Sequence, residues 1–248
     1  NDRLAIVLPN GPEMAACFIA AACGVATAPL NPAYRAEEFE FYLSDLNARA
    51  LVVEQGSASP AVAVAQRLGV AIIELVPDLA AGAGSFPLQC AHAPGISAEL
   101  PGLAQPSDVS MVLHTSGTTS RPKIVPLSQA NLCASAQHIA RTLAFTGADR
   151  GLNIMPLFHI HGLIAAVLSS LRAGAYVVCA PGFNALQFFS WIKEVKPSWY
   201  TAVPTMHQAI LSRAARNKEV IDENKLRFIR SSSASLPPQI MTELEEVF

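Results

Sequence analysis

Short apolar runs alternate with amphipathic segments along most of the chain. Residues 4–8, 50–54 and 109–113 are mostly aliphatic and have the length of buried strands. Residues 35–47 instead place their large side chains three or four positions apart, which is the spacing of one helix face. Apolar strands that alternate with helices predict parallel sheets covered by helices on both faces, so the expected fold class is α/β.

The same pattern predicts the remaining elements and their grouping. Strands are predicted at 4–8, 25–30, 50–54, 70–75, 109–113, 152–155, 176–179, 199–202 and 227–230. Helices are predicted at 12–23, 35–47, 60–68, 128–145, 162–172 and 185–195, and to start at Pro204 and Pro237. Residues 77–107 are rich in Ala, Gly, Pro and Ser and are predicted to form a loop. We therefore predict a first α/β subdomain over 1–76, a connecting loop over 77–107 and a second α/β subdomain over 108–248.

The composition narrows the class of protein. Of the 248 residues 15% are charged, against about 25% in an ordinary domain. Hydrophobic residues make up 51% of the chain, which suits a large buried core. The formal net charge is −2, so the sequence lacks the positive charge that nucleic-acid binding requires, and no nucleic acid is expected as a partner.

The cysteines and one Ala-rich segment bear on the compartment. Five cysteines are spread along the chain without a C-x-x-C pair, which favours thiols in a reducing compartment. Gly24 and Pro29 interrupt the Ala-rich residues 14–30, so no membrane span is predicted. We expect a cytoplasmic protein, or a peroxisomal one if a C-terminal signal lies beyond Phe248.

The stretch from Thr115 to Lys123 carries the strongest chemical signal. It reads Thr-Ser-Gly-Thr-Thr-Ser-Arg-Pro-Lys and follows the apolar run 109–113. Such a loop suits a polyphosphate, because Gly117 lets backbone N–H groups point outward while hydroxyls and Lys123 contact phosphate oxygens. A surface turn rich in Ser and Thr is the alternative. The candidate phosphate-binding residues are Thr115, Ser116, Gly117, Thr118, Thr119, Ser120, Arg121, Pro122 and Lys123.

This loop is not a Walker A sequence. Counting from Gly117, that pattern needs Gly, Lys and Ser or Thr at the positions of Pro122, Lys123 and Ile124. Pro122 has no N–H to donate, and Ile124 has no hydroxyl for Mg²⁺. We therefore do not expect Ras-like or kinase-like chemistry.

The loop resembles the signature of the adenylate-forming superfamily, whose usual form is Thr-Ser-Gly-Thr-Thr-Gly-x-Pro-Lys-Gly. This superfamily contains acyl-CoA synthetases, aryl-CoA ligases, luciferases and the adenylation domains of peptide synthetases. The chain has Ser120 and Ile124 where Gly is common. Ser120 with the following Arg-Pro-Lys, and residues 156–163, 199–208 and 226–236, are similar to the branch of oxalate–CoA ligases and related peroxisomal-type CoA synthetases.

The resemblance covers the whole chain and implies an N-terminal fragment, because Phe248 falls roughly halfway along a member of the family. It implies the large N-terminal domain of these enzymes, incomplete, with two βα-layered subdomains. The Mg²⁺-binding Glu, the ribose-binding Asp and a small C-terminal domain with a catalytic Lys would lie beyond Phe248. We therefore expect the fragment alone to be inactive.

The resemblance also implies a reaction, that of an ATP-dependent carboxylate–CoA ligase. ATP and a small carboxylic acid would form an acyl-adenylate, and coenzyme A would then form the thioester, with Mg²⁺ as the metal. Residues 115–123 would hold the β- and γ-phosphates, with Lys123 in a catalytic role. The alternatives are a ligase for medium-chain fatty or aryl acids and, from a different class, a nucleotide-binding module without catalysis.

His159 and His161 form an H-x-H pair. On a strand both rings would lie on one side, which invites a zinc site, but no Cys or acidic residue lies nearby in sequence as a third ligand. Purely structural histidines are another interpretation. The resemblance implies that His159 lies beside the acyl carboxylate in a catalytic role and that His161 lines the acyl pocket. No metal ligands are predicted within the chain.

Ser231, Ser232 and Ser233 occupy a stretch that reads Ser-Gly-Ala in aryl-CoA ligases, where it forms part of the acyl pocket wall. Hydroxyls make this wall polar, and a buried second carboxylate needs such donors. The expected substrate is therefore a small polar acid such as oxalate. The alternative is a Ser-rich turn before a helix. Trp199 and Tyr200 are expected to pack in the core.

Overall fold

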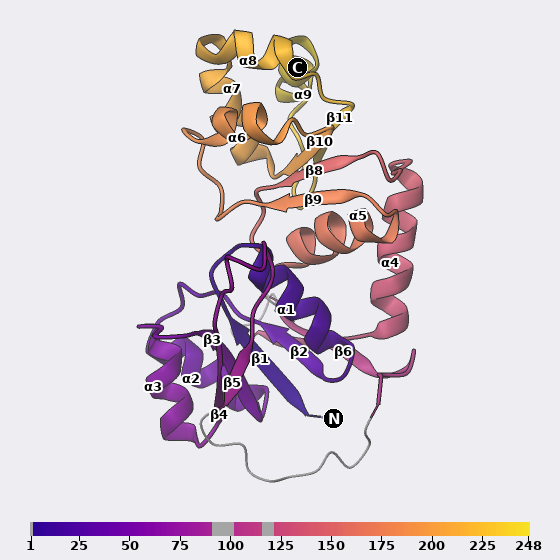
Figure 1. Cartoon of the computed structure of the whole chain (residues 1–248). Coiled ribbons are helices and arrows are strands. Elements are labelled where there is room, and N and C mark those ends of the chain that lie inside the picture. Colours follow the sequence, from indigo (N-terminus) through magenta and orange to yellow (C-terminus); the bar gives the residue numbers. More distant parts are fainter. Residues whose placement is uncertain (1, 91–101, 116–121) are drawn as a thin grey trace. The chain divides into compact units, whose positions relative to one another are not determined.

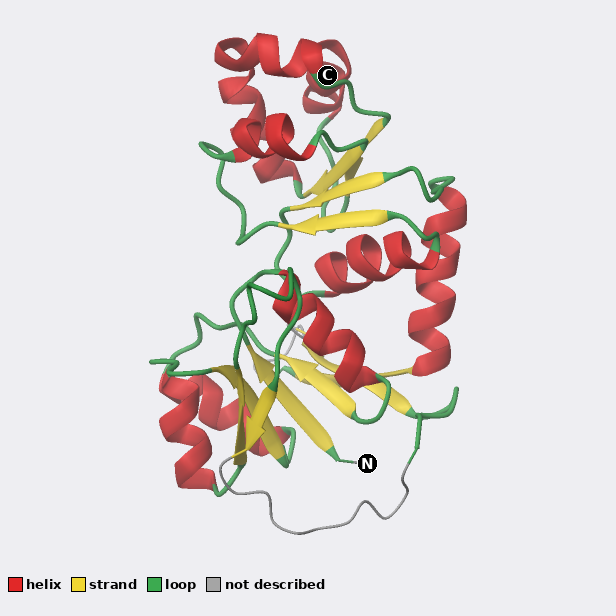
Figure 2. Cartoon of the chain, in the orientation of Figure 1, coloured by secondary structure: helices red, strands yellow, loops and turns green. Residues whose placement is uncertain are grey.

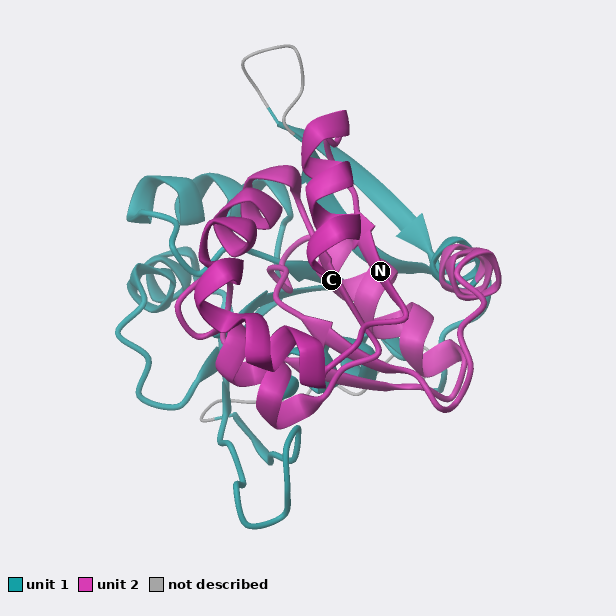
Figure 3. Ribbon diagram, turned by 90° about the horizontal axis from the view of Figure 1, so that it is seen from above, with its two compact units in different colours: residues 1–133 teal, residues 134–248 magenta. Residues whose placement is uncertain are grey.

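The computed structural model describes residues 2–90, 102–115 and 122–248 (Figures 1 and 2). The chain forms two compact units, which are coloured separately in Figure 3. Unit 1 comprises residues 1–133, and unit 2 comprises residues 134–248. The α/β class predicted from the hydrophobic pattern is confirmed in both units.

Unit 1 is built on a seven-stranded sheet in the order β5-β4-β3-β1-β2-β6-β7. The strands are β1 (Arg3–Val7), β2 (Ala26–Pro29), β3 (Ala50–Glu54), β4 (Ala71–Leu75), β5 (Leu88–Cys90), β6 (Val109–Thr115) and β7 (Lys123–Ser128). The five central strands run parallel, whereas β5 and β7 pair antiparallel at the two edges. Parallel central strands explain the continuous apolar runs, because both of their faces are covered.

Three helices cover this sheet: α1 (Pro12–Ala22), α2 (Ala36–Asp45) and α3 (Pro60–Leu68). The chain moves outward from β1 to β2 and then crosses back to β3, so right-handed crossovers place α1 and α2 on opposite faces. α2 and α3 share one face, where Phe39 and Val64 pack with Leu51 of β3. α3 has clear end signals, because the Ser59 hydroxyl accepts from the N–H of Ala61 and Gly69 ends the helix at φ 69°.

Two strands of this sheet were not predicted. β5 lies within the segment 77–107 that was expected to be a loop, and β7 lies between the candidate phosphate loop and the helix predicted from Ser128, where no element was predicted. β7 escapes a simple strand pattern because it contains Pro126, which an edge strand tolerates since one side of it needs no ladder hydrogen bonds. The helix α4 (Gln129–Thr142) follows directly, and the Ser128 hydroxyl accepts from the N–H of Asn131 near its start.

The predicted subdomain border also differs from the observed division. Residues 77–107 were expected to separate two subdomains, with the second beginning at residue 108. β6 and β7 instead complete the sheet of unit 1, where the Thr27 hydroxyl of β2 donates to the carbonyl of Ser110 of β6 at 2.8 Å. The division by contacts therefore falls after Cys133, within α4.

Unit 2 contains a four-stranded parallel sheet in the order β11-β10-β8-β9. Its strands are β8 (Arg150–Asn153), β9 (Tyr176–Cys179), β10 (Trp199–Ala202) and β11 (Phe228–Ser231). Its helices after α4 are η1 (His161–Leu168), α5 (Ser169–Arg172), α6 (Phe188–Val195), α7 (Pro204–Ala214), η2 (Ala215–Asn217), α8 (Lys218–Glu223) and α9 (Pro238–Val247). Side chains alternate between the two faces along each strand, so successive residues of β10 lie in two different environments.

One face of this sheet is an apolar core. Tyr200 of β10 packs there with Leu152 of β8, Phe188 of α6 and Ile210 of α7, all of them fully buried. On the other face Trp199 stacks on Phe228 with ring centroids 5.5 Å apart. Burial of Trp199 and Tyr200 confirms the prediction that both are core residues.

The buried carboxylate of Asp149 connects the segments that lead into three of these strands. It accepts from the backbone N–H of Thr146 at 2.8 Å, from the hydroxyl of Ser198 at 2.9 Å and from Nε of Arg227 at 2.9 Å. Burial raises the pKa of Asp149, but these hydrogen bonds and the Arg227 charge outweigh it and hold the pKa below its ordinary value. The network fixes the ends of β8, β10 and β11 relative to one another.

No helix in the described parts of the chain is long and apolar enough to cross a membrane.

Candidate functional site

The candidate phosphate loop lies at the end of an antiparallel hairpin. β6 and β7 pair so that Thr115 stands opposite Lys123, which brings the two ends of the loop together. Both residues are exposed, and Lys123 forms no ion pair with another described residue. Ser116, Gly117, Thr118, Thr119, Ser120 and Arg121 lie outside the described residues.

The loop end of this hairpin is fixed by His114, a residue that the sequence analysis missed. Its side chain is only 5% exposed, and its Nε2 lies 2.9 Å from a carboxylate oxygen of Asp45 at the end of α2. Its ring meets Tyr42 edge to face, with centroids 4.7 Å apart. The signal was a histidine directly before the loop, which the motif-based interpretation passed over. His114 therefore connects the end of β6 to the end of α2.

The two histidines of the H-x-H pair do not lie on a strand, so the strand geometry that was considered for a zinc site does not apply to their rings. They lie in the turn after β8 and at the first residue of η1, where positions two apart face different directions. His159 is exposed and its ring contacts that of Phe158, whereas His161 is 5% exposed. Partial desolvation lowers the pKa of His159.

Gly162 explains how η1 begins so close to the preceding turn. A Cβ at this position would lie 2.3 Å from the carbonyl oxygen of Pro156 and 3.2 Å from that of Met155. Only a residue without a side chain permits this approach. This close packing of Gly162 against Pro156 fixes the backbone at the start of η1 and thereby positions the ring of the preceding residue, His161. η1 itself is a π-helix, a form that is common at functional sites.

His161 is the centre of a polar network on the same face of the sheet as Trp199. Its Nε2 lies 2.6 Å from the hydroxyl of Thr201, and its Nδ1 lies 3.0 Å from the hydroxyl of Ser233. Arg230 stands beside Thr201 in the β10–β11 register and donates to the Thr201 and Ser232 hydroxyls, each at 3.4 Å. The structure thus joins three predicted residues, His161, Ser232 and Ser233, with two that were not predicted, Thr201 and Arg230.

The electrostatics of this network keep the His161 ring neutral. Burial lowers the pKa of His161 to about 4, and the charges of Arg230, His159 and His207 act in the same direction. Burial also lowers the pKa of Arg230. Arg230 forms no ion pair with any other residue in the described ranges, so its charge is available to an anion.

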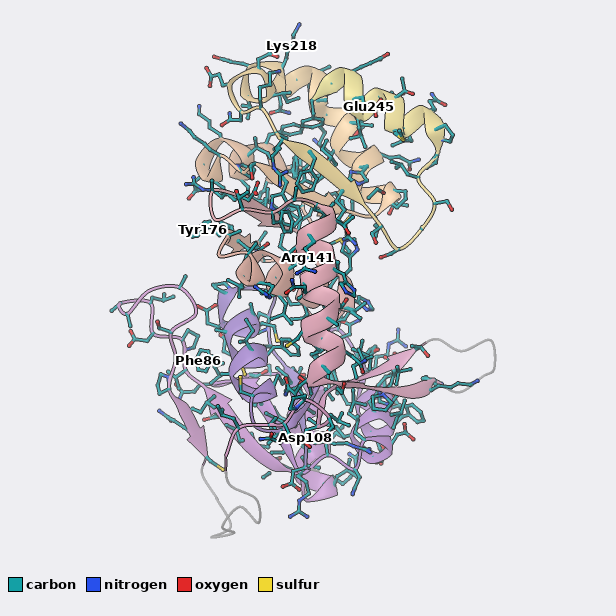
Figure 4. All side chains as sticks on the ribbon, turned by 90° about the vertical axis from the view of Figure 1, so that its right-hand side faces the viewer. Phe86, Asp108, Arg141, Tyr176, Lys218 and Glu245 are labelled. Atoms are coloured by element: carbon teal, nitrogen blue, oxygen red, sulfur yellow. The ribbon has the colours of Figure 1, made fainter. Side chains whose placement is uncertain are left out.

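Ser231, the third predicted serine, faces elsewhere. Its hydroxyl is buried without a hydrogen-bond partner, on the face of β11 opposite to Arg230. It borders a cavity of about 400 Å³ between β11 and α9, lined by Phe228, Ile229, Met241 and Leu244, with Glu245 (labelled in Figure 4) at its side. The structure therefore does not bring Ser231 together with Ser232 and Ser233.

A second buried histidine, His207 of α7, supports the same sheet from its other face. Its Nδ1 lies 3.1 Å from the hydroxyl of Tyr200, and burial lowers its pKa. Its Nε2 makes no hydrogen bond of ordinary geometry, although backbone groups of Arg230 and Ala202 lie near enough to favour the protonated ring. His207 is a core residue that packs behind β10.

The arrangement provides hydrogen-bond donors and a cation rather than a metal cage. Across the described residues no group of three or more His, Cys, Asp or Glu side chains is placed to hold a metal ion. Ser232, Ser233 and Arg230 can bind an anionic group, and Thr115 with Lys123 can contact phosphate oxygens. Neither set supplies an activated nucleophile, so the chemistry that suits it depends on positioning and charge neutralisation.

Comparisons with known proteins show the family and the fold of the chain. A family model described as AMP-binding enzyme matches residues 1–248. The chain is 45% identical over 255 residues to the probable CoA ligase CCL9 of Humulus lupulus and 43% identical over 252 residues to an oxalate–CoA ligase of Arabidopsis thaliana. Its fold is similar to that of ATP-bound MatB from Rhodopseudomonas palustris, with a TM-score of 0.79 at 23% identity over 100% of this chain and 48% of that one. In both of these sequence comparisons the match covers 100% of this chain and 48% of the relative. The chain therefore spans about half the length of each relative.

Proposed function

Because the chain belongs to the AMP-binding enzyme family, we propose that the protein is an ATP-dependent carboxylate–CoA ligase. The observation that carries the proposal is the match of the family model along residues 1–248, together with the similarity to CoA ligases at 45% and 43% identity. The exposed Thr115 and Lys123 at the two ends of the candidate phosphate loop support it, since they suit a polyphosphate.

In the first step an oxygen of the substrate carboxylate attacks the α-phosphorus of ATP, and the bond to pyrophosphate breaks. Residues 115–123 hold the β- and γ-phosphates, and the Lys123 ammonium neutralises charge that moves onto the leaving pyrophosphate. In the second step the sulfur of coenzyme A attacks the acyl carbon, and AMP leaves. His159 lies beside the reacting carboxylate in this proposal, where its exposed ring can donate a hydrogen bond.

The proposed substrate is a small polar acid, with oxalate first. Ser232 and Ser233 with His161 form a polar patch, and Arg230 adds a cation without a carboxylate partner among the described residues. A long apolar tail gains nothing from such a surface, whereas a second carboxylate gains charge-assisted hydrogen bonds. The identity of 43% to an oxalate–CoA ligase supports this choice. Ser231 is left out of this proposed polar patch, because its hydroxyl lies on the other face of β11, beside the cavity next to α9.

We expect a magnesium ion to accompany ATP, but no group of three or more His, Cys, Asp or Glu side chains among the described residues is placed to hold a metal ion. Binding of the ion is therefore not assigned to any residue of this chain.

The proposal is tested by pyrophosphate release with the intact protein. Replacing Lys123 or Thr119 by Ala should remove about 2–4 kcal/mol of transition-state stabilisation each, which is roughly a thirty- to thousand-fold loss of rate. Lys218→Ala is the matched control, because Lys218 is an exposed lysine of unit 2 outside the site (labelled in Figure 4). Wild-type rates in both loop variants at limiting ATP would contradict the assignment of the phosphate loop.

A further inference from the structure

The hydrogen bonds around His161 have a direction that the structure determines. Thr201 is fully buried, and within the described parts of the chain its hydroxyl has two hydrogen-bond partners, Nε2 of His161 at 2.6 Å and NH1 of Arg230 at 3.4 Å. A guanidinium has no acceptor, so the Thr201 proton cannot go to Arg230. A buried hydroxyl needs an acceptor for its proton, and Nε2 of His161 is the one within reach. Thr201 therefore donates to Nε2.

It follows that the proton of the neutral His161 ring lies on Nδ1. The ring is neutral because burial lowers its pKa to about 4. Nε2 is occupied as an acceptor, so Nδ1 carries the hydrogen and donates it to the Ser233 hydroxyl at 3.0 Å. The opposite tautomer would leave the Thr201 proton buried without an acceptor, which is costly.

The two serines at the surface of the network are likewise hydrogen-bond acceptors within it. Ser233 accepts from His161, and Ser232 accepts from NH2 of Arg230, so each keeps its own hydroxyl proton for another partner. Ser233 is exposed and Ser232 is half-buried, which leaves both protons accessible. Together with the Arg230 guanidinium they present donors toward any bound molecule.

The backbone of Ser233 supports a functional use of its hydroxyl. Its φ is 72°, in the left-handed region that is costly for residues other than glycine. A glycine would adopt this conformation freely but would lack the hydroxyl. Strain at one residue of a polar site is the kind of observation from which a functional role can be inferred.

We propose that Thr201 is a positioning residue that fixes the tautomer of His161, so that Ser233 keeps its hydroxyl proton and presents it, together with the donors of Ser232 and Arg230, to a second anionic group on the acyl substrate. The group is a carboxylate or sulfonate next to the reacting carboxylate. The part that concerns the substrate rests on the proposed function, whereas the tautomer does not.

The tautomer is tested by NMR on the intact protein labelled with [¹⁵N]histidine. The His161 signals are assigned by their absence in His161→Gln. We expect a protonated Nδ1 and an unprotonated Nε2 in the wild-type protein near neutral pH. In Thr201→Val the bias disappears and the Nε2–H form becomes populated, whereas Thr201→Ser restores the wild-type signals because it keeps the hydroxyl. A protonated Nε2 in the wild-type protein overturns the proposal.

The substrate part is tested by comparing oxalate with oxamate, in which a neutral amide replaces one carboxylate. A surface of donors should favour oxalate by roughly a hundredfold or more in kcat/KM, because the amide brings donors of its own. Thr201→Val should reduce this ratio by about tenfold or more, and Thr201→Ser should restore it. An equal preference for the two acids in the wild-type protein, or an unchanged ratio in a folded Thr201→Val, overturns the substrate part.

The outcomes separate this proposal from the proposed function. If no acid yields a thioester, the proposed function fails, and the NMR result still decides the tautomer. If Thr201→Val does not fold, the wild-type tautomer and the wild-type ratio of oxalate to oxamate decide the two parts. A wild-type Nδ1–H signal with a strong preference for oxalate supports both.

Discussion

Replacing Gly162 by Ala tests how the start of η1 positions His161. The added Cβ would lie 2.3 Å from the carbonyl oxygen of Pro156, about 1 Å closer than an ordinary carbon–oxygen contact. Helix propensity alone predicts a gain of about 0.5–1 kcal/mol for Ala over Gly. Overpacking should cost about 1–3 kcal/mol. A shift of the helix start by about 1 Å would also break the 2.6 Å contact between His161 and Thr201, which leaves a buried hydroxyl unpaired at a cost of about 1–3 kcal/mol.

The loss therefore exceeds the gain, and we expect a net destabilisation of about 1–5 kcal/mol. The assay is urea unfolding followed by tryptophan fluorescence, because the chain has two tryptophans, Trp191 and Trp199, and both lie in unit 2. Gly147→Ala is the matched control in the same unit, since its Cβ would meet its nearest neighbour, the carbonyl oxygen of Gly174, at an ordinary 3.4 Å. A midpoint for Gly162→Ala equal to or above that of the control would refute the reasoning.

Three further changes give measurable results. Asp149→Asn should lower the free energy of unfolding by about 1–3 kcal/mol, because it removes the charge that pairs with Arg227. The folded pKa of Asp149 lies below its ordinary value, so the wild-type carboxylate stabilises the fold above about pH 4 and loses this effect as the pH falls through the folded pKa. In acid, the urea midpoint of the variant should therefore depend less on pH than that of the wild-type protein. Gly151→Ala would place a Cβ 2.8 Å from the Trp199 ring and should lower the thermal midpoint, with an unchanged midpoint counting against the close contact. Ser233→Gly should have a higher thermal midpoint than Ser233→Ala, because both lose the hydroxyl that accepts from His161 and only Gly relieves the positive φ, while kcat/KM for oxalate falls in both; a midpoint no higher than that of Ser233→Ala would contradict the strain argument.

The hydrophobic pattern was sufficient for most of the fold because parallel strands are buried on both faces. β1, β3 and β10 lie where apolar runs were found, and α3 lies between its Ser59 cap and Gly69. β5 was not predicted, because its three residues Leu88–Cys90 are all exposed and give no apolar run. β7 was not predicted because Pro126 interrupts its pattern. Its pairing with β6 is a long-range effect that local sequence does not encode.

The candidate site was predictable only where chemistry is local. The loop 115–123 and the pair His159–His161 could be identified from short motifs. The roles of Thr201 and Arg230 depend on the β10–β11 register, which places them side by side although they are far apart in the sequence. The sequence predicted a helix from Gly162, whereas the helix η1 begins at His161, where the close contact of Gly162 with Pro156 lets it start. Ser231 was grouped with its neighbours by adjacency, but alternation along β11 turns it to the opposite face.

The most direct test of the central claim is thioester formation by the intact protein with ATP, coenzyme A and an equimolar mixture of oxalate, malonate, acetate, coumarate and octanoate. The acyl-CoA products are separated and identified by mass spectrometry, and AMP and pyrophosphate are counted in the same reaction. We expect one AMP and one pyrophosphate per thioester, with oxalyl-CoA as the main product. A main product from octanoate or coumarate would contradict the polar acid pocket, and the absence of any ATP-dependent thioester would contradict the ligase itself.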